Sequence, residues 1–278
     1  MKKIQNLSFD EERAFYGKKN LDLHNCKNQG KADGESAFKE CENIKATQCL
    51  FGLRYPFWHT KKISLKNCEF SYSCRAPLWY SQNINIQQSK IYSVKAVREC
   101  SNVSFDGCDI RSPECFWFSK NISVKNSKMQ GEYFMFKSSK GVFENLDFQG
   151  KYSFQYTKNL SFNNCVFFTK DAFWHAENVV VKNSVVTGEY LGWYSKNLTL
   201  ENCEIRGTQP FCYCENLTLK NCKMIGCDLA FEKSSVKATI TTKVDSIKNP
   251  KSGKITLPEV GEIILDDKGA KGKIEIKK

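Results

Sequence analysis

The pattern Asn159-Leu160-Ser161-Phe162-Asn163-Asn164-Cys165 recurs along most of the chain. It returns 19 residues later as Asn178-Val179-Val180-Val181-Lys182-Asn183-Ser184, and every step from Asn83 onward has this length. The first three steps are 23, 19 and 21 residues long. A repeat of this period is typical of a solenoid, in which each coil buries its apolar side by stacking on its neighbours. The first residue of the pattern, here called the lead residue, falls at Asn20, Asn43, Lys62, Asn83, Asn102, Asn121, Lys140, Asn159, Asn178, Asn197, Asn216 and Ser235.

Residues at the same place in successive coils form what we call a column. The columns one and three residues after the lead are apolar in nearly every coil, which is the period-2 alternation of short β-strands. The column five after the lead is mostly asparagine, which tolerates a left-handed turn and can form an amide ladder along the stack. The sequence therefore predicts an all-β, single-stranded parallel β-helix of about twelve 19-residue coils. We expect a right-handed helix, because crossovers between parallel strands have that hand and no six-residue subrepeat is present.

The repeat crosses the middle of the 278-residue chain without a break, so we expect one β-helix over residues 1–242. Beyond this point the period fails. Short apolar runs around Ile247, Ile255, Ile263 and Ile274, separated by Pro250 and Pro258 among other breaks, predict a β-rich C-terminal cap over residues 243–278.

No stretch of the chain has the 18 or so apolar residues that a membrane helix needs. The segment 1–12 is basic at its start but lacks the apolar core of a secretory signal. We expect a cytoplasmic protein that makes no membrane contact.

The sequence contains 14 cysteines, a number that would suggest disulfides in a small secreted domain. Half of them share the column six after the lead, where other coils have serine or leucine: Cys26, Cys49, Cys68, Cys108, Cys165, Cys203 and Cys222. Equivalent residues in stacked coils lie about 4.8 Å apart, which is wide for the ~3.8 Å Cβ separation of a disulfide. We expect buried free thiols in a reducing compartment, with no metal site and no cofactor.

The formal net charge of +12 favours acidic partners. The lysines are scattered around the coil with acidic residues between them, so no basic stripe stands out. Nucleic acid is therefore an unlikely partner, and a lysine-rich surface that keeps the solenoid soluble is the simpler interpretation.

All five tryptophans fall in the column four before the lead, here called the tryptophan column: Trp58, Trp79, Trp117, Trp174 and Trp193. The same column also has Lys39, Arg98 and Gln155. Because burial of an unpaired charge costs several kcal/mol, we expect this column to face outward.

The next column, three before the lead, is here called the corner column; it has Glu40, His59, Tyr80 and Glu99 in four consecutive coils and Tyr156, His175, Tyr194 and Tyr213 further along. Aromatic faces beside hydrogen-bonding groups suit sugar rings, and large exposed apolar patches mark interaction sites. The predicted ligand-binding residues are Lys39, Trp58, Trp79, Arg98, Trp117, Trp174, His175, Trp193 and Tyr194. The alternative is that these rings only cover the sheet, or form an interface in a homo-oligomer.

For catalysis, the candidate residues are Glu40, His59, Tyr80 and Glu99. His59 would act as acid or base, Glu40 would orient it, and Arg98 would neutralise a substrate carboxylate. Glu40 and Glu99 lie three coils apart, hence roughly 14 Å, at the spacing of strands. Glycosidase carboxylate pairs are about 5–9.5 Å apart, so the spacing argues against a hydrolase pair.

Four strings resemble an uncharacterised, mostly bacterial family of unknown function that is grouped with pectin-lyase-like right-handed β-helices. They are residues 9–16 (FDEERAFY), 33–41 (DGESAFKEC), 54–59 (RYPFWH) and 171–176 (DAFWHA). The resemblance covers nearly the whole chain and implies the fold, but no reaction. The wider superfamily includes pectate lyases and polygalacturonases, whose clustered aspartates and calcium site have no counterpart here.

The leading hypothesis is a protein that binds a carbohydrate-like or acidic small ligand along its Trp/His/Tyr face. One alternative is a lyase or hydrolase acting on polysaccharides or sugar acids through His59 with Glu40 or Glu99. A second alternative is a non-catalytic protein-interaction scaffold.

Overall fold

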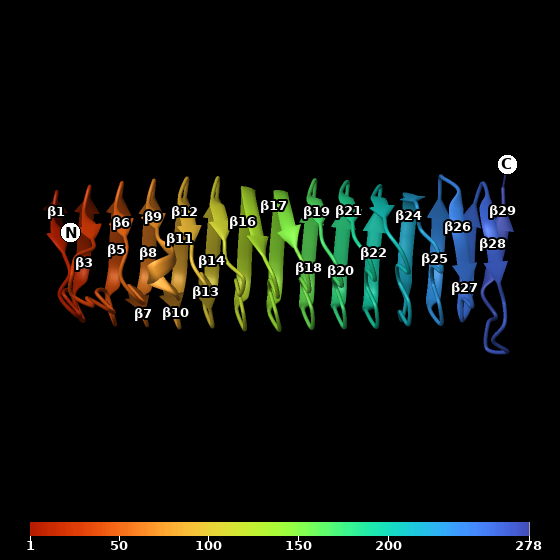
Figure 1. Ribbon diagram of the computed structural model, residues 1–278, viewed down its shortest axis with the longest axis horizontal. Helices are drawn as coiled ribbons and strands as arrows, with labels where there is room; N and C mark the ends of the chain where they lie inside the picture. Colours follow the sequence, from red (N-terminus) through yellow and green to blue (C-terminus); the bar gives the residue numbers. More distant parts are fainter. Residues whose placement is uncertain (278) are drawn as a thin grey trace. The chain divides into compact units, whose positions relative to one another are not determined.

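The computed structural model describes residues 1–277, and their regular structure is almost entirely β-strand (Figure 1). The chain divides into two compact units, Met1–Gly141 (unit 1) and Val142–Lys278 (unit 2). In each unit the strands of successive coils lie side by side (Figure 1). In the part of the chain that the structure describes, no helix is long and apolar enough to span a membrane.

Unit 1 contains sixteen strands and one short 3₁₀-helix, Tyr72–Cys74. The strands are β1 (Lys2–Gln5), β2 (Ser8–Phe9), β3 (Lys19–His24), β4 (Lys27–Asn28), β5 (Glu42–Thr47), β6 (Leu50–Phe51), β7 (Phe57–Trp58), β8 (Lys61–Lys66), β9 (Glu69–Phe70), β10 (Leu78–Trp79), β11 (Gln82–Gln87), β12 (Lys90–Tyr92), β13 (Val97–Arg98), β14 (Ser101–Asp106), β15 (Asp109–Arg111) and β16 (Lys120–Gly131).

Strand β17 (Ser139–Gly150) contains the boundary between the units. The other strands of unit 2 are β18 (Lys158–Asn163), β19 (Val166–Phe168), β20 (Glu177–Lys182), β21 (Val185–Thr187), β22 (Lys196–Glu201), β23 (Glu204–Arg206), β24 (Leu217–Ile225), β25 (Ser235–Ile240), β26 (Val244–Lys248), β27 (Ser252–Leu257), β28 (Val260–Ile264) and β29 (Lys273–Ile276).

The strands pair in parallel with the register of the sequence repeat. In unit 1, Ile44 pairs with Ile63 and Ile63 with Ile84. In unit 2, Leu160 pairs with Val179 and Val179 with Leu198. These pairings confirm the predicted parallel β-solenoid and its period of about 19 residues. The right-handed winding and the count of twelve coils stay predictions.

The region predicted as a cap is built from strands, as expected. Strand β27 pairs in parallel with β25, and β29 pairs with β27, so the main sheet of unit 2 continues through this region. Strands β26 and β28 form a separate parallel pair beside it. The proposed boundary between residues 242 and 243 stays a prediction.

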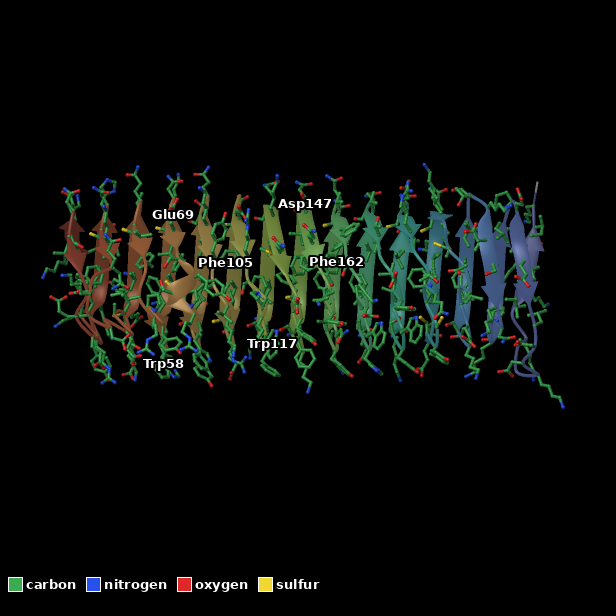
Figure 2. The ribbon with its side chains drawn as sticks, in the orientation of Figure 1. Trp58, Glu69, Phe105, Trp117, Asp147 and Phe162 are labelled. Carbon is green, nitrogen blue, oxygen red and sulfur yellow. The ribbon has the colours of Figure 1, made fainter. Side chains whose placement is uncertain are left out.

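The core of each unit is filled by the apolar columns, with phenylalanine rings stacked from coil to coil. In unit 1 the buried rings of Phe38 and Phe57 are stacked with centroids 5.0 Å apart, and in unit 2 those of Phe154 and Phe173 are 5.1 Å apart. Full burial of one such ring contributes about 1.5–3 kcal/mol. Phe105 and Phe162, labelled in Figure 2, are buried rings of another apolar column, three residues after the lead.

Both asparagine columns form amide ladders along the coils. In the lead column, Nδ2 of Asn121 donates to Oδ1 of Asn102 and Nδ2 of Asn102 to Oδ1 of Asn83, each at 2.8 Å. In the column five after the lead, Nδ2 of Asn221 donates to Oδ1 of Asn202 at 2.9 Å. These asparagines have φ near +50 to +57°, a left-handed conformation that asparagine adopts more readily than other non-glycine residues.

All fourteen cysteines are free and buried, which confirms the expectation of free thiols. The structure also explains why serine replaces cysteine in some coils. The backbone N–H of Cys68 donates to Oγ of Ser89 at 3.0 Å, and Oγ donates in turn to the carbonyl of Gln87 at 2.7 Å. The thiol of Cys68 donates in the same way to the carbonyl of Lys66 at 3.4 Å. Most coils therefore use a small side chain here that can both donate and accept a hydrogen bond, and Leu146 is an apolar exception.

Candidate functional site

The corner column has a left-handed backbone in every coil where it was singled out from the sequence. The φ angles are 58° at Glu40, 54° at His59, 54° at Tyr80 and 53° at Glu99. A left-handed non-glycine residue costs of order 1 kcal/mol, and here it marks the sharp bend between two segments of the coil. The bend leaves Glu40, His59 and Tyr80 exposed, whereas Thr60 and Ser81, one residue further on, are buried.

In unit 1 the tryptophan column forms one continuous stack of rings and cations. The ammonium of Lys39 lies 4.6 Å from the centroid of the Trp58 ring, and the Trp58 and Trp79 rings are stacked at 5.8 Å. The guanidinium of Arg98 lies 5.9 Å from the Trp79 ring and 5.3 Å from the Trp117 ring. Figure 2 shows Trp58 and Trp117 toward the same end of the coils, with Glu69 toward the opposite end.

This stack brings together all the ligand-binding residues predicted in unit 1, but only part of each side chain is accessible to a ligand. Lys39, Trp58, Trp79, Arg98 and Trp117 are all half-buried. The flat faces of the rings contact neighbouring rings or cations, which is favourable by cation–π and stacking interactions. A sugar ring would therefore meet ring edges and the polar corner column rather than open aromatic faces.

The indole N–H groups differ within the same stack. Nε1 of Trp117 donates to the carbonyl of Tyr133 at 2.7 Å. Nε1 of Trp58 and of Trp79 is buried and has no hydrogen-bond partner among the described residues. A buried donor without an acceptor destabilises by about 1–3 kcal/mol, so these two nitrogens are the least satisfied polar groups of the site.

The structure places the four predicted catalytic residues in one corner column without connecting the histidine to either carboxylate. The His59 and Tyr80 rings are stacked at 4.9 Å. Oε2 of Glu40 accepts a hydrogen bond from the Tyr16 hydroxyl at 2.9 Å, and this bond raises the pKa of Tyr16. Glu99 pairs with Arg98, Oε1 to Nε, at 3.3 Å. Within residues 1–277, no hydrogen bond or ion pair joins His59 to Glu40 or Glu99.

Unit 2 has the more regular corner. Four rings stack edge-outward in consecutive coils, and we call them the tyrosine–histidine ladder: Tyr156, His175, Tyr194 and Tyr213. Their centroids are separated by 4.8, 5.0 and 4.8 Å, and their planes deviate by at most 11°. Tyr156 and Tyr194 are 45% and 42% exposed, so the ring edges reach solvent at each coil.

Behind this ladder, the Trp174 and Trp193 rings are stacked at 5.3 Å with an angle of 3° between them. Their Nε1 atoms donate to the backbone carbonyls of Tyr190 at 2.7 Å and Gln209 at 2.8 Å. These bonds fix the indoles, and the indoles in turn support the ladder; the rings of Trp193 and Tyr213 meet at 5.7 Å.

The predicted site residues thus fall into two groups, one in each unit. Trp174, His175, Trp193 and Tyr194 lie together in unit 2, whereas the remaining five binding residues and the four catalytic candidates lie together in unit 1. The predicted set omits Tyr156 and Tyr213, although the corner column contains both. It also omits Tyr16, which contacts Glu40 and so joins the first two coils. Tyr16 could have been found from the sequence, because it falls in the tryptophan column.

Neither group provides a cluster of metal ligands. Among the described residues, no three or more His, Cys, Asp or Glu side chains are placed to hold a metal ion. The polar groups of the corners are phenols, imidazoles, single carboxylates and cations. They can donate and accept hydrogen bonds and can pair with a charged ligand.

Comparison with solved structures finds enzymes of very low sequence identity. The A-module of the Azotobacter vinelandii mannuronan C-5 epimerase AlgE4 is 9% identical, with a TM-score of 0.32 and coverage of 99% of this chain and 87% of that one. The Yersinia enterocolitica family 28 exopolygalacturonase is 8% identical, with a TM-score of 0.32 and coverage of 99% and 73%. We draw nothing about function from these likenesses.

A search of curated proteins gave no match. A family match, in contrast, covers residues 2–277 and so nearly the whole chain. It confirms the resemblance found in the four sequence strings. The chain belongs to the family described as Protein of unknown function (DUF3737).

Proposed function

We propose that the protein binds an extended, carbohydrate-like ligand along its corner columns, without catalysing a reaction on it. The observation that carries the proposal is the tyrosine–histidine ladder of unit 2, which repeats a polar ring edge at every coil with a spacing of 4.8–5.0 Å. Phenol and imidazole edges donate and accept hydrogen bonds. A chain molecule with hydroxyl groups along its length can bond to several of them in succession.

The corner of unit 1 would contribute the charged part of the same kind of surface. Lys39 and Arg98 are cationic and half-buried, and Glu40, His59 and Tyr80 are exposed beside them. Arg98 is already paired with Glu99 and Glu114, so Lys39 would be the cation whose charge-assisted hydrogen bonds favour a ligand with carboxylate groups. The tryptophans of both units would support these residues and contact the ligand through their ring edges.

The enzyme alternative has weaker support. Glu40 is bound to Tyr16 and Glu99 to Arg98, so neither carboxylate is held against His59 as an orienting or proton-accepting group. A general base is expected within hydrogen-bond reach of its partners. We therefore keep catalysis at His59 as the second hypothesis and binding as the first.

The proposal includes a reducing, cytoplasmic location. It is supported by the fourteen free, buried thiols, because free cysteines are typical of reducing compartments. Fractionation of the native host followed by thiol labelling of the denatured protein tests this part. Recovery in an extracellular fraction, or thiols blocked as disulfides, contradicts it.

A glycan array with wild-type protein and matched variants tests the binding. Tyr156→Phe combined with Tyr194→Phe removes two hydroxyl groups from the ladder and leaves its rings in place. Tyr72→Phe is the control, because Tyr72 is exposed on the 3₁₀-helix of unit 1 and outside both corner columns. We expect wild type and control to bind the same glycans and the double variant to bind them about thirtyfold more weakly, at ~1 kcal/mol for each of the two lost hydrogen bonds.

Three outcomes contradict the proposal. The first is a wild-type protein that binds no glycan, and the second is a double variant that binds as well as the control. The third is a wild-type dimer, seen by light scattering, that becomes monomeric in Trp174→Ala. That result would make the ladder an interface between two copies, which is the scaffold hypothesis.

A further inference from the structure

The regular stacking of unit 2 is interrupted between β24 and β25. Leu219 pairs with Ala238, but Cys222 pairs with Ile240, so two residues of β24, Lys220 and Asn221, oppose one residue of β25. This is the arrangement of a β-bulge. Bulges bend a strand, redirect side chains and are frequent beside functional sites.

A cleft of about 650 Å³ lies at this bulge, within unit 2. Its polar lining consists of lysines and threonines: Thr199, Thr218, Lys220, Lys237, Thr239, Lys254 and Thr256. The side of the cleft at β27 begins with Gly253, whose φ is 94° and where a Cβ would lie 2.0 Å from the carbonyl oxygen of Val236. A side chain at this position would press against the backbone, so glycine lets the two strands approach closely here.

Three lysines stack in register, and we call them the lysine ladder: Lys237 and Lys254, which line the cleft, and Lys273, which lies beside Lys254 on β29. Lys237 pairs in register with Lys254, and Lys254 with Lys273. In-register neighbours are about 4.8 Å apart, and like charges placed opposite one another destabilise a sheet. The ladder is therefore unfavourable for the folded protein alone.

Elsewhere in unit 2, several lysines face an acidic residue of the next coil. Lys158 pairs with Glu177 at 2.7 Å, Lys182 with Glu201 at 3.2 Å, and Lys196 with Glu215 at 3.1 Å. At the cleft, Lys254 pairs with Glu275 at 2.9 Å. Lys220, Lys237 and Lys273 have no ion pair among the described residues.

We propose that this cleft binds a ligand with two or more oxyanion groups. The ammonium groups of the lysine ladder and of Lys220 would neutralise the anion, and the threonine hydroxyls beside them would donate further hydrogen bonds. Binding of such an anion would reduce the repulsion between the stacked lysines. No aromatic side chain lines the cleft, so it lacks the stacking surface that single-stranded nucleic acid needs.

This site is separate from the proposed glycan surface. Its residues lie on the strands β22, β24, β25, β27 and β29, whereas the tyrosine–histidine ladder lies in the corner column. Failure of the glycan proposal would leave this inference standing, and the reverse is also true.

Calorimetry with inorganic tripolyphosphate and with citrate, at constant ionic strength, tests the site on the full chain. The two probes distinguish phosphate from carboxylate groups as the source of the charge. The test variant is Lys237→Gln/Lys254→Gln/Lys273→Gln. The matched control is Lys158→Gln/Lys182→Gln/Lys196→Gln, which removes the same charge from lysines that already have acidic partners.

We expect wild type and control to bind at least one probe with similar affinity and the test variant to bind it about tenfold or more weakly, because its charge-assisted bonds are gone. Without ligand, the test variant should melt at a higher temperature than wild type and the control should not, since only the test variant loses like-charge contacts. The inference is overturned if neither probe binds, if both variants lose affinity equally, or if the test variant melts below the control.

Discussion

The tryptophan column is built on two different backbones, one in the early coils of unit 1 and one in the later coils of the chain. In the early coils the residue just before the tryptophan column lies in a short strand, as in β7, β10 and β13, and is not left-handed. In unit 2 the corresponding residues, Phe173, Gly192 and Phe211, have φ of 62°, 72° and 63°. One repeat thus supports an extended and a left-handed form of the same bend.

The difference decides whether an indole N–H is satisfied. Trp58 and Trp79 are followed by coils with the extended form, and their Nε1 atoms have no partner. Trp174 and Trp193 are followed by coils with the left-handed form, and their Nε1 atoms bond to a carbonyl of that coil. Trp117, in unit 1, is followed by Met135 at φ 65° and is bonded as well. The left-handed form therefore directs a backbone carbonyl toward the tryptophan of the preceding coil.

The largest expected effect comes from placing a β-branched residue in the two forms. Phe57→Val and Phe173→Val both remove a buried ring and should each destabilise by about 2 kcal/mol or more. Phe173→Val should lose about 1 kcal/mol beyond this, because valine is strongly disfavoured at positive φ. Urea unfolding of the two variants measures the difference. Equal losses would show that the two forms do not differ in their tolerance of valine.

A smaller effect is expected from removing the indole nitrogen. Trp193→Phe breaks the bond to the Gln209 carbonyl, whereas Trp79→Phe removes a donor that has no acceptor. Both variants lose similar ring area, but Trp79→Phe also removes an unsatisfied donor, so Trp193→Phe should be less stable by at least about 1 kcal/mol. Paired denaturation curves provide the measurement. A more damaging Trp79→Phe would mean that its indole has an acceptor that we have not identified.

The smallest effect concerns a buried carboxyl group beside the left-handed form of the bend. Burial raises the pKa of Asp171, two residues before Phe173. The folded state therefore favours the protonated acid: its contribution is most favourable below the pKa of the unfolded chain and is lost as the pH rises through the folded pKa. Asp171→Asn should stabilise the protein near neutral pH, and the gain should shrink in acid. Unfolding midpoints at about pH 7 and about pH 3 test this.

A control for the last prediction is Asp147→Asn, at an exposed position of the same unit. It should give little gain at either pH. The interpretation fails if Asp171→Asn gives the same gain at both pH values, because the benefit would then come from the left-handed backbone preference of asparagine rather than from charge.

The fold could be predicted from the sequence because the 19-residue repeat identifies which residues stack on one another. The alternation after Asn159 predicted the strands, and the exchange of Cys68 for Ser89 in one column predicted a small buried side chain without a disulfide. The same reasoning placed Trp174 beside Trp193 and His175 beside Tyr194, which the structure confirms as ring stacks.

The backbone conformation just before the tryptophan column could not be predicted from the sequence. Phe57 and Phe173 belong to one column and are both buried, yet one is extended and the other left-handed, so residue type does not distinguish them. The sequence interpretation assumes that inward- and outward-facing residues alternate regularly through the bend, so it does not predict that the faces of the Trp58 and Trp79 rings are covered. The lysine ladder was missed for another reason: Lys237 and Lys254 are separated by an irregular step, so they share no column of the 19-residue repeat.

The buried thiols make local opening of the coils measurable by chemical labelling. They are spread from Cys26 to Cys227. Burial raises the pKa of Cys41 to about 11 and that of Cys100 to about 12, so these two thiols are unreactive while their coils are closed. A coil that opens locally exposes its own thiol while its neighbours stay protected. Alkylation followed by peptide mapping would therefore order the coils by how often they open. In an oxidising environment, two coils that open together would be able to oxidise their two thiols to a disulfide, and that bond would prevent them from closing again.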